Sequence, residues 1–449
     1  MGNSFKELTA LNLFKWLVLA SLVFLTAFYT LPWTIEHALT MEYSGLDFHG
    51  YWYAGHFVRQ GVNSYAAILN ARTPNYWNPA FPGSGNPNLP SDTEQALVLP
   101  IRYLDGPVVT EHPVARAMIV VPAVTAPLNL TLGLFAWFSW PTARLLWMLF
   151  NLAFAFSIPW LALRLLDGSI QLERVDTLIF AFVFYNFYGV RQSIVVGQQA
   201  LVCLFLLLLA LLASRNRPWV SGLLLGLGIS KYSVGTPTFL YYAIRKRFLA
   251  IMVALALQGF ALLALLFLER GSPFETILAY FRIFAVNASQ NGVHLLARFD
   301  NRLLQAILFV LISILTITGL VRCATQRNLT DRLDGRIGLQ EINLLTVSIF
   351  MVTYHRIHDM SFMIFFFLLW VVSTLEAKAQ VNWLTVGGIL ALFLLMFPTL
   401  PAQMLPFLPP DWLTVEAVSS LTLVFVFAMS LVVVRQHPAS GLARRDGVR

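Results

Sequence analysis

The chain is organised around long apolar segments that are separated by short polar connections. The stretch 248–268 is the cleanest of them, since Gln258 is its only strongly polar side chain. A helix needs about 20 mostly apolar residues to cross the hydrocarbon core of a bilayer. The pattern therefore predicts an all-α polytopic membrane protein with about ten to twelve membrane helices. The apolar segments are 14–31, 142–163, 175–193, 199–214, 219–230, 234–244, 248–268, 303–321, 340–354, 360–375, 383–399 and 413–434.

Composition excludes the soluble enzyme classes. Of the 449 residues, 58% are hydrophobic and 12% are charged, whereas a soluble protein has about 45–50% apolar and about 25% charged residues. A single water-soluble core cannot bury that much apolar surface. The two cysteines, Cys203 and Cys323, lie within or at the end of apolar segments, so we interpret them as packing residues and not as a disulfide framework.

Basic residues predict the orientation, because short cytoplasmic loops carry an excess of Lys and Arg. Placing the basic clusters on one side requires 219–230 and 234–244, each too short to cross alone, to return to the side they left. We therefore expect a broken re-entrant hairpin over 219–244, with Lys231 near its tip, and cytoplasmic termini. The net charge of +8 then reflects topology, and no nucleic-acid partner is expected. The clusters are Arg215/Arg217, Arg245/Lys246/Arg247, Arg322/Arg327/Arg332/Arg336 and Arg435/Arg444/Arg445/Arg449.

One integral membrane domain is predicted over 1–435, followed by a basic cytoplasmic tail over 436–449. In this topology the loops 32–141 and 269–302 and the tight connection 354–359 face the exterior. The first of these loops has about 110 residues, which is too long for a simple connector and indicates a functional loop. No small-x-small cleavage site follows the first apolar segment, so we expect it to be a retained span.

Ionisable residues at membrane depth are costly unless they are paired or functional. Asp47 heads the first such group, with His49, Tyr51, Trp52 and His56 close behind it. As the first residue of a helix, Asp47 could simply be an N-cap. An aromatic belt explains Trp and Tyr at an interface, but it does not explain a carboxylate together with two histidines.

A second group lies at 354–359, where His355, Arg356, His358 and Asp359 stand between two apolar segments. Four titratable side chains this close together favour a site. The structural alternative is a solvated turn that is held by an Arg356–Asp359 pair.

Two further groups involve Lys231 and the segment 191–199. Lys231 follows Gly222 and Gly226, and it could snorkel to an interface while the glycines serve close helix packing. Arg191 and Gln198 lie at the outer end of a predicted span, where the structural alternative is interhelical hydrogen bonding.

All four groups fall on the external face of the predicted topology. A carboxylate can act as general base for an acceptor hydroxyl, and cations can stabilise a leaving phosphate. One carboxylate then suffices, whereas glycosidases usually use two. The outer loops hold no Asp-x-Asp pair or His/Cys metal spacing, and Asp92-Thr-Glu94 is the nearest approach, so no cofactor and no obligatory metal is expected.

The stretch Asp47-Phe-His-Gly-Tyr-Trp-Tyr-Ala-Gly55, followed by Gly61-Val-Asn-Ser-Tyr65, resembles the first external loop of glycosyltransferase family 87, in the GT-C superfamily. That loop typically reads Asp-Phe-x-x-Tyr-x-Ala and then Gly-x-x-Pro-Tyr, so Ser64 replaces the usual proline. Later landmarks follow in order, and Gln199 and His358 depart from them. They are Glu111-His-Pro113, Gly197-Gln198, Gly222…Gly226-Leu…Lys231 and His355…His358-Asp359.

The family includes mycobacterial polyprenol-phosphate-mannose-dependent mannosyltransferases. The resemblance implies a GT-C-type fold and an inverting transfer of a sugar, such as mannose, from a polyprenyl-phosphate donor at the external or periplasmic face of a bacterial inner membrane. The acceptor would be a hydroxyl on a lipid or glycan, and Asp47 would be the catalytic base. We expect Lys231, His355, Arg356 and His358 to bind the donor phosphate. Candidate sugar or acceptor contacts are His49, Tyr51, Trp52, Arg191, Gln198 and Asp359.

Two rival functions remain open. Broken hairpins and buried cations also build the substrate sites of transporters and flippases for lipid-linked or anionic substrates. Such carriers usually show internal repeats, and none is found here. An oligosaccharide polymerase or ligase would also use an external loop, but the carboxylate directly after the first span argues against it.

Overall fold

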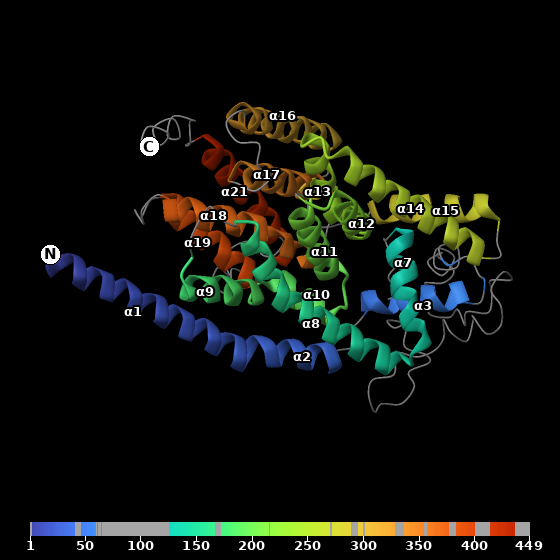
Figure 1. Cartoon of the computed structure of the whole chain (residues 1–449), viewed down its shortest axis with the longest axis horizontal. Coiled ribbons are helices and arrows are strands. Elements are labelled where there is room, and N and C mark those ends of the chain that lie inside the picture. Colours follow the sequence, from blue (N-terminus) through green and yellow to red (C-terminus); the bar gives the residue numbers. More distant parts are fainter. Residues whose placement is uncertain are drawn as a thin grey trace.

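The computed structural model describes residues 2–40, 46–59, 61, 64, 125–166, 172–214, 216–269, 272–288, 295–299, 301–327, 336–353, 357–376, 383–399 and 414–435. Every regular element within these ranges is a helix (Figure 1). The predicted all-α class is therefore confirmed. The predictions for His355, Arg356 and 436–449 lie outside the described residues, as does the part 65–124 of the predicted loop 32–141.

Each of the twelve apolar segments contains at least one helix. The elements are α1 (Gly2–Leu25), η1 (Thr26–Thr30), α2 (Leu31–Thr40), α3 (Leu46–Arg59), α7 (Ala126–Gly133), η2 (Leu134–Trp137), α8 (Trp140–Arg164), α9 (Arg174–Tyr185), α10 (Tyr188–Val195), α11 (Ala200–Ala213), α12 (Pro218–Gly228), α13 (Tyr232–Ile244), α14 (Phe248–Leu268), α15 (Pro273–Ala288), η3 (Leu295–Arg298), α16 (Arg302–Arg327), α17 (Arg336–Val352), η4 (Ile357–Met363), α18 (Ile364–Glu376), α19 (Trp383–Met396) and α21 (Val415–Arg435).

Five helical stretches are long and apolar enough to cross a membrane, and a sixth arises if α9 and α10, which meet at 53°, count as one broken span. Several of the other apolar segments form helices of 10–17 residues. The chain is thus a polytopic helical membrane protein. The described helices supply five or six spans by length and composition, where the apolar pattern predicts about ten to twelve.

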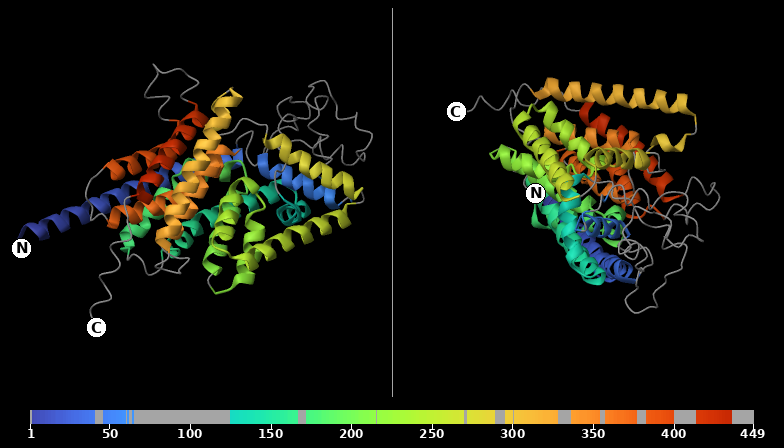
Figure 2. Two further views of the ribbon diagram at one scale, coloured as in Figure 1. Left: turned by 90° about the horizontal axis from the view of Figure 1, so that it is seen from above. Right: turned by 90° about the vertical axis from the view of Figure 1, so that its right-hand side faces the viewer.

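The helix α16 lies along one edge of the molecule against α17 and α21 (Figure 1, Figure 2). On the side of α16 that faces the bundle, the Thr316 hydroxyl forms a hydrogen bond with the Ser348 hydroxyl of α17 (2.7 Å). The outer face repeats at helical spacing and is apolar, as expected for a span at the rim of a bundle. Its exposed residues are Leu303, Ile307, Val310, Ile314, Ile317 and Val321.

The first span is longer than the pattern indicates. α1, the π-helical turn η1 and α2 form one helical stretch along the edge formed by α8 and α9 (Figure 1). Asn186 fixes the π-helical turn, because its amide donates to Thr26 Oγ1 (2.8 Å) and accepts from Thr30 Oγ1 (2.5 Å). Lys15 pairs with Asp176 at 3.0 Å. The predicted loop 32–141 therefore begins as helix.

Two close helix crossings bring the first loop and the predicted hairpin onto the bundle. A Cβ at Gly55 of α3 would lie 2.5 Å from the carbonyl oxygen of Gly133, so α3 and α7 touch backbone to backbone. Gly222 and Gly226 of α12 lie against α14, where added Cβ atoms would meet Val253 and Ala254. These two glycines thus serve helix packing.

The predicted hairpin over 219–244 takes the form of two short helices, α12 and α13, with Lys231 at the junction. α12 packs on α11 and α14, and α13 packs mainly on α17. Its return to the side of entry stays a prediction, as do the cytoplasmic termini and the external loops.

Candidate active site

Asp47 lies in the first turn of α3, and both its backbone and its side chain contact the segment that follows α10. Its N–H donates to the carbonyl of Val196 (2.9 Å), and its Oδ2 accepts a hydrogen bond from Gln198 Nε2 at 2.5 Å. The side chain is buried. The carboxylate therefore serves a contact between two segments and is not simply a helix cap.

A left-handed glycine presents Gln198 to Asp47. Gly197 has φ of 71° directly after α10, a conformation that favours glycine at a helix C-terminus. The N–H of Gln198 then donates back to Ser193 O (2.8 Å), and Trp147 Nε1 donates to Gly197 O (2.7 Å). This turn stops α10 and aims the Gln198 side chain at α3.

His358 and Asp359 lie on η4, which packs tightly on α10. A Cβ at Gly189 would lie 2.7 Å from Ile357 O, and Ser193 Oγ lies 3.2 Å from His358 O. The ring atom His358 Nε2 is 2.9 Å from Gln198 Nε2 and 3.7 Å from Asp359 Oδ1. Both side chains are buried, so the solvated-turn interpretation is wrong for these two residues.

Lys231 completes the arrangement from the junction of α12 and α13. Its Nζ lies 2.5 Å from Asp359 Oδ1, and its side chain is only 8% exposed. The neighbouring carbonyl of Ser230 accepts a hydrogen bond from Thr125 N (2.8 Å) at the start of α7. Snorkelling does not describe Lys231, because its ammonium is paired inside the protein.

These contacts form one buried polar chain that runs from Asp47 through Gln198, His358 and Asp359 to Lys231. The five residues come from four separate parts of the sequence. The topology predicted from the sequence puts all four parts on the external face of the membrane. A buried charge is stable only when it is paired or hydrogen-bonded, and both conditions are met here by Lys231–Asp359 and by Gln198–Asp47.

Tyr51 and Trp52 support the start of α3. The Tyr51 hydroxyl donates to Gln199 Oε1, and burial, with a contribution from the Asp47 charge, raises the pKa of Tyr51 well above its usual value. Tyr51 is therefore a neutral hydrogen-bond donor. Trp52 Nε1 donates to Phe138 O (3.1 Å), away from the polar chain. The position of the His49 side chain lies outside the described residues, as does Tyr53.

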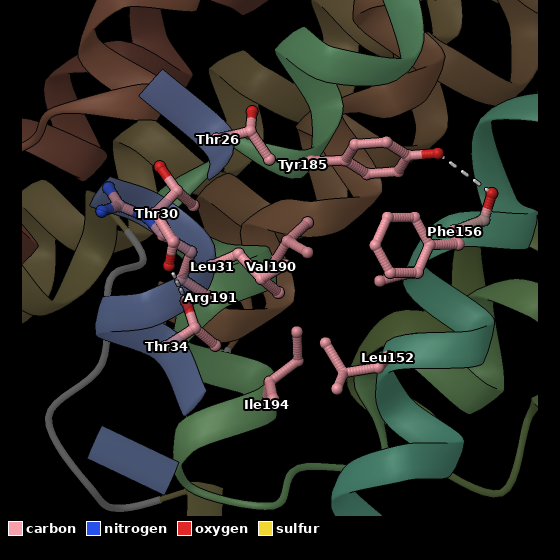
Figure 3. Close-up of a pocket in the computed structure, with 11 residues that line it drawn as sticks. Thr26, Thr30, Leu31, Thr34, Leu152, Phe156, Tyr185, Val190, Arg191 and Ile194 are labelled. Carbon is pink, nitrogen blue, oxygen red and sulfur yellow. Dashed lines mark hydrogen bonds between the residues drawn. The ribbon is translucent and has the colours of Figure 1, made fainter. Parts of the chain in front are cut away.

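Arg191 is not brought together with the polar chain. Its Nη2 donates to Met396 O (2.7 Å) at the end of α19, and its guanidinium lies over the rings of Trp33 and Tyr188 at 5.6 and 5.4 Å. This is the interhelical role of the structural alternative. Arg191 also lines a small pocket between η1, α2, α8, α9 and α10 (Figure 3).

A buried carboxylate that the sequence does not single out lies at the end of α14. Glu269 Oε1 accepts from Ser64 N (2.8 Å) and Ser64 Oγ (2.7 Å), and Glu269 Oε2 accepts from Thr276 at 3.2 Å. Asn129 on α7 reaches Ser64 Oγ at 3.4 Å. Burial raises the pKa of Glu269, while these hydrogen bonds lower it. The one sequence feature that could have indicated Glu269 is its position directly after the most apolar span, 248–268.

No group of three or more His, Cys, Asp or Glu side chains within the described ranges is placed to hold a metal ion. The polar chain presents one carboxylate held by an amide and one ammonium held by a second carboxylate. Such a set can accept a proton and bind an anion.

The family model of glycosyltransferase family 87 matches residues 125–398. The chain belongs to glycosyltransferase family 87. The match confirms the resemblance drawn from the motifs and makes the protein a membrane glycosyltransferase, which acts on a sugar donor and an acceptor. Comparison with curated proteins and with solved structures gives no significant match.

Four of the five residues in the polar chain of this glycosyltransferase lie inside the matched range, and Asp47 lies before it. The contact between Asp47 and Gln198 is one of several that join the first loop to the matched range.

Proposed function

We propose that this glycosyltransferase moves a sugar, such as mannose, from a polyprenyl-phosphate donor to a hydroxyl on a lipid or glycan acceptor, with inversion at the anomeric carbon. The reaction takes place at the external or periplasmic face. The observation that carries the proposal is the buried polar chain, which joins a carboxylate to an ammonium within a membrane-spanning body.

Asp47 is the general base of the proposed reaction. As the acceptor O–H bond breaks, its proton passes to the Asp47 carboxylate, and the oxygen forms a bond to the anomeric carbon. The bond from that carbon to the phosphate oxygen breaks on the opposite face, and polyprenyl phosphate leaves with the electron pair. The leaving phosphate needs no proton, so one catalytic carboxylate suffices.

Lys231 stabilises the leaving phosphate in this scheme. An ammonium carries three N–H donors, and Asp359 accepts from one of them. The pairing with Asp359 holds the ammonium in a fixed, buried position before the donor arrives. His355, Arg356 and His358 remain proposed partners of the same phosphate, and membrane lipid surrounds the polyprenyl chain.

Release of polyprenyl phosphate from a purified enzyme tests the proposal directly. With a polyprenyl-phosphate mannose donor and a hydroxyl acceptor, Asp47→Asn should reduce kcat by about 100- to 10,000-fold. The asparagine oxygen still accepts from Gln198, so the fold should persist. Asp176→Asn is the matched control. Asp176 pairs with Lys15 on α1 and is not part of the polar chain, so this variant should leave kcat unchanged.

Inversion is tested by the anomeric configuration of the product. Full activity in Asp47→Asn would exclude the base assignment. Movement of the intact donor across a vesicle membrane, without release of polyprenyl phosphate, would favour the transporter.

A further inference from the structure

Three fixed contacts determine the orientation of the Gln198 amide. The backbone N–H of Gln199 donates to Gln198 Oε1 at 3.0 Å, and this hydrogen bond identifies that atom as the amide oxygen. The nitrogen Nε2 then faces Asp47 Oδ2 at 2.5 Å and His358 Nε2 at 2.9 Å. A flipped amide would place an oxygen against a carboxylate and break both contacts. Gln198 therefore donates one N–H to each neighbour.

This arrangement also selects one form of the His358 ring. A ring nitrogen that accepts a hydrogen bond must carry its lone pair there, so the ring is neutral and its proton is on Nδ1. Protonation of Nε2 would set two N–H groups against each other and draw the ring toward Asp359, whose Oδ1 is 3.7 Å away. The amide contact with His358 would then be lost.

We infer that Gln198 is a positioning residue of the transfer reaction: it orients the Asp47 carboxylate and holds His358 as the neutral ring protonated on Nδ1. The kinetic part of this inference rests on the proposed role of Asp47 as general base, and the tautomer part does not. An N–H donor stabilises a buried carboxylate in its charged form, which is the form that can accept a proton.

Other titratable groups lie along or next to the polar chain. They are Tyr51 on α3, Cys203 on α11, His358 and Asp359 on η4, and Lys231 between α12 and α13. The test therefore changes Gln198 alone and leaves these groups in place.

Gln198→Met keeps the length of the side chain and removes both donors. We expect kcat to fall about 10- to 100-fold while KM changes by less than about twofold, because the donor acts on the base and not on the substrate. The acidic limb of the pH–kcat profile should move to higher pH, since the protonated carboxyl is now favoured. Gln340→Met is the matched control: Gln340 is also buried, on α17 beside Glu341, which pairs with Arg245.

A second measurement needs no substrate. The chain has eight histidines, so ¹⁵N-histidine labelling with His358→Phe identifies the His358 ring signals. At neutral pH the wild-type ring should show protonated Nδ1 and unprotonated Nε2. In Gln198→Met the ring should lose this preference, and in Gln340→Met it should keep it.

The two measurements separate the possible failures. A fall of kcat that is the same at every pH, with an unchanged His358 ring in Gln198→Met, would overturn the inference. Wild-type enzyme that releases no polyprenyl phosphate would refute the proposed function, whereas the ring measurement would still decide the arrangement of Gln198 and His358.

Discussion

Lys231 and Asp359 form a buried ion pair, with 2.5 Å between Nζ and Oδ1, although 128 residues separate them in the sequence. The exposed fraction of the side chains is 8% for Lys231 and 1% for Asp359. Removing two charges from water is unfavourable, and the pair persists only because each charge compensates the other. The ion pair thus connects η4 to the junction of α12 and α13 and places the ammonium at the end of the polar chain.

Breaking this pair on one side should destabilise the enzyme strongly. Asp359→Asn leaves an uncompensated ammonium in the interior, and we expect a loss of about 3–5 kcal/mol in the free energy of unfolding. The double variant Lys231→Met/Asp359→Leu replaces the pair with apolar side chains and should recover most of that stability. Chemical denaturation in detergent measures both.

Activity distinguishes the two roles of the pair. The stable double variant should still lose release of polyprenyl phosphate, because it lacks the proposed phosphate-binding ammonium. Recovery of activity together with stability would mean that Lys231 is structural only.

Glu269 should make stability depend on pH. Burial raises its pKa in the folded state above the value of the unfolded chain. Its contribution is then fully present below the unfolded pKa, and it is lost as the pH rises through the folded pKa. Wild-type enzyme should therefore lose stability relative to Glu269→Gln as the pH rises.

Glutamine suits this comparison because its oxygen can still accept both hydrogen bonds from Ser64. Thermal unfolding of both proteins across a pH series gives the difference. A difference that stays constant with pH would show that Glu269 does not change its protonation on unfolding. Glu275→Gln is the control, since Glu275 is exposed on the adjoining helix α15.

Span positions could be predicted from the sequence because length and hydropathy are local properties. The segment 248–268 became α14 with the same bounds. The position of Lys231 between two helices could likewise be predicted, because a lysine separates two apolar stretches that are each too short to span the membrane. Pairing partners could not be predicted, since Asp47 and Gln198 are 151 residues apart and their contact depends on how α3 packs.

Arg191 and Gln198 show the limit of grouping residues by closeness in sequence. They are seven positions apart, yet the turn at Gly197 aims Gln198 at α3 while Arg191 reaches α19. Ser64 shows a second limit. A proline at this position would lack the N–H that donates to Glu269, so this departure from the family pattern is tied to a carboxylate more than 200 residues away.

The crossing of α3 and α7 should tolerate no side chain at Gly55. An alanine Cβ there would lie 2.5 Å from Gly133 O and 2.9 Å from Ala136 Cβ, so the two helices must separate. We expect Gly55→Ala to cost about 1–3 kcal/mol in the free energy of unfolding and to lower kcat, because α3 carries Asp47.

Gly259→Ala is the matched control for that crossing. Gly259 lies inside α14, and a Cβ built there meets nothing within 4 Å. This variant should be neutral or more stable by up to about 1 kcal/mol, since alanine is the better helix former. Equal stability of Gly55→Ala and Gly259→Ala in thermal unfolding would show that α3 and α7 do not touch at this point.

Arg191 should matter for stability and not for the transfer step. Its guanidinium binds the carbonyl of Met396 and the faces of two rings, and lysine cannot reproduce that planar geometry. We expect Arg191→Lys to lower the free energy of unfolding by about 1–3 kcal/mol while kcat stays within about threefold of wild type. A loss of kcat comparable to that of Asp47→Asn, in a protein of unchanged thermal stability, would instead make Arg191 a substrate-binding residue. Stability and kcat measured on the same preparation separate these outcomes, because the polar chain from Asp47 to Lys231 does not pass through Arg191.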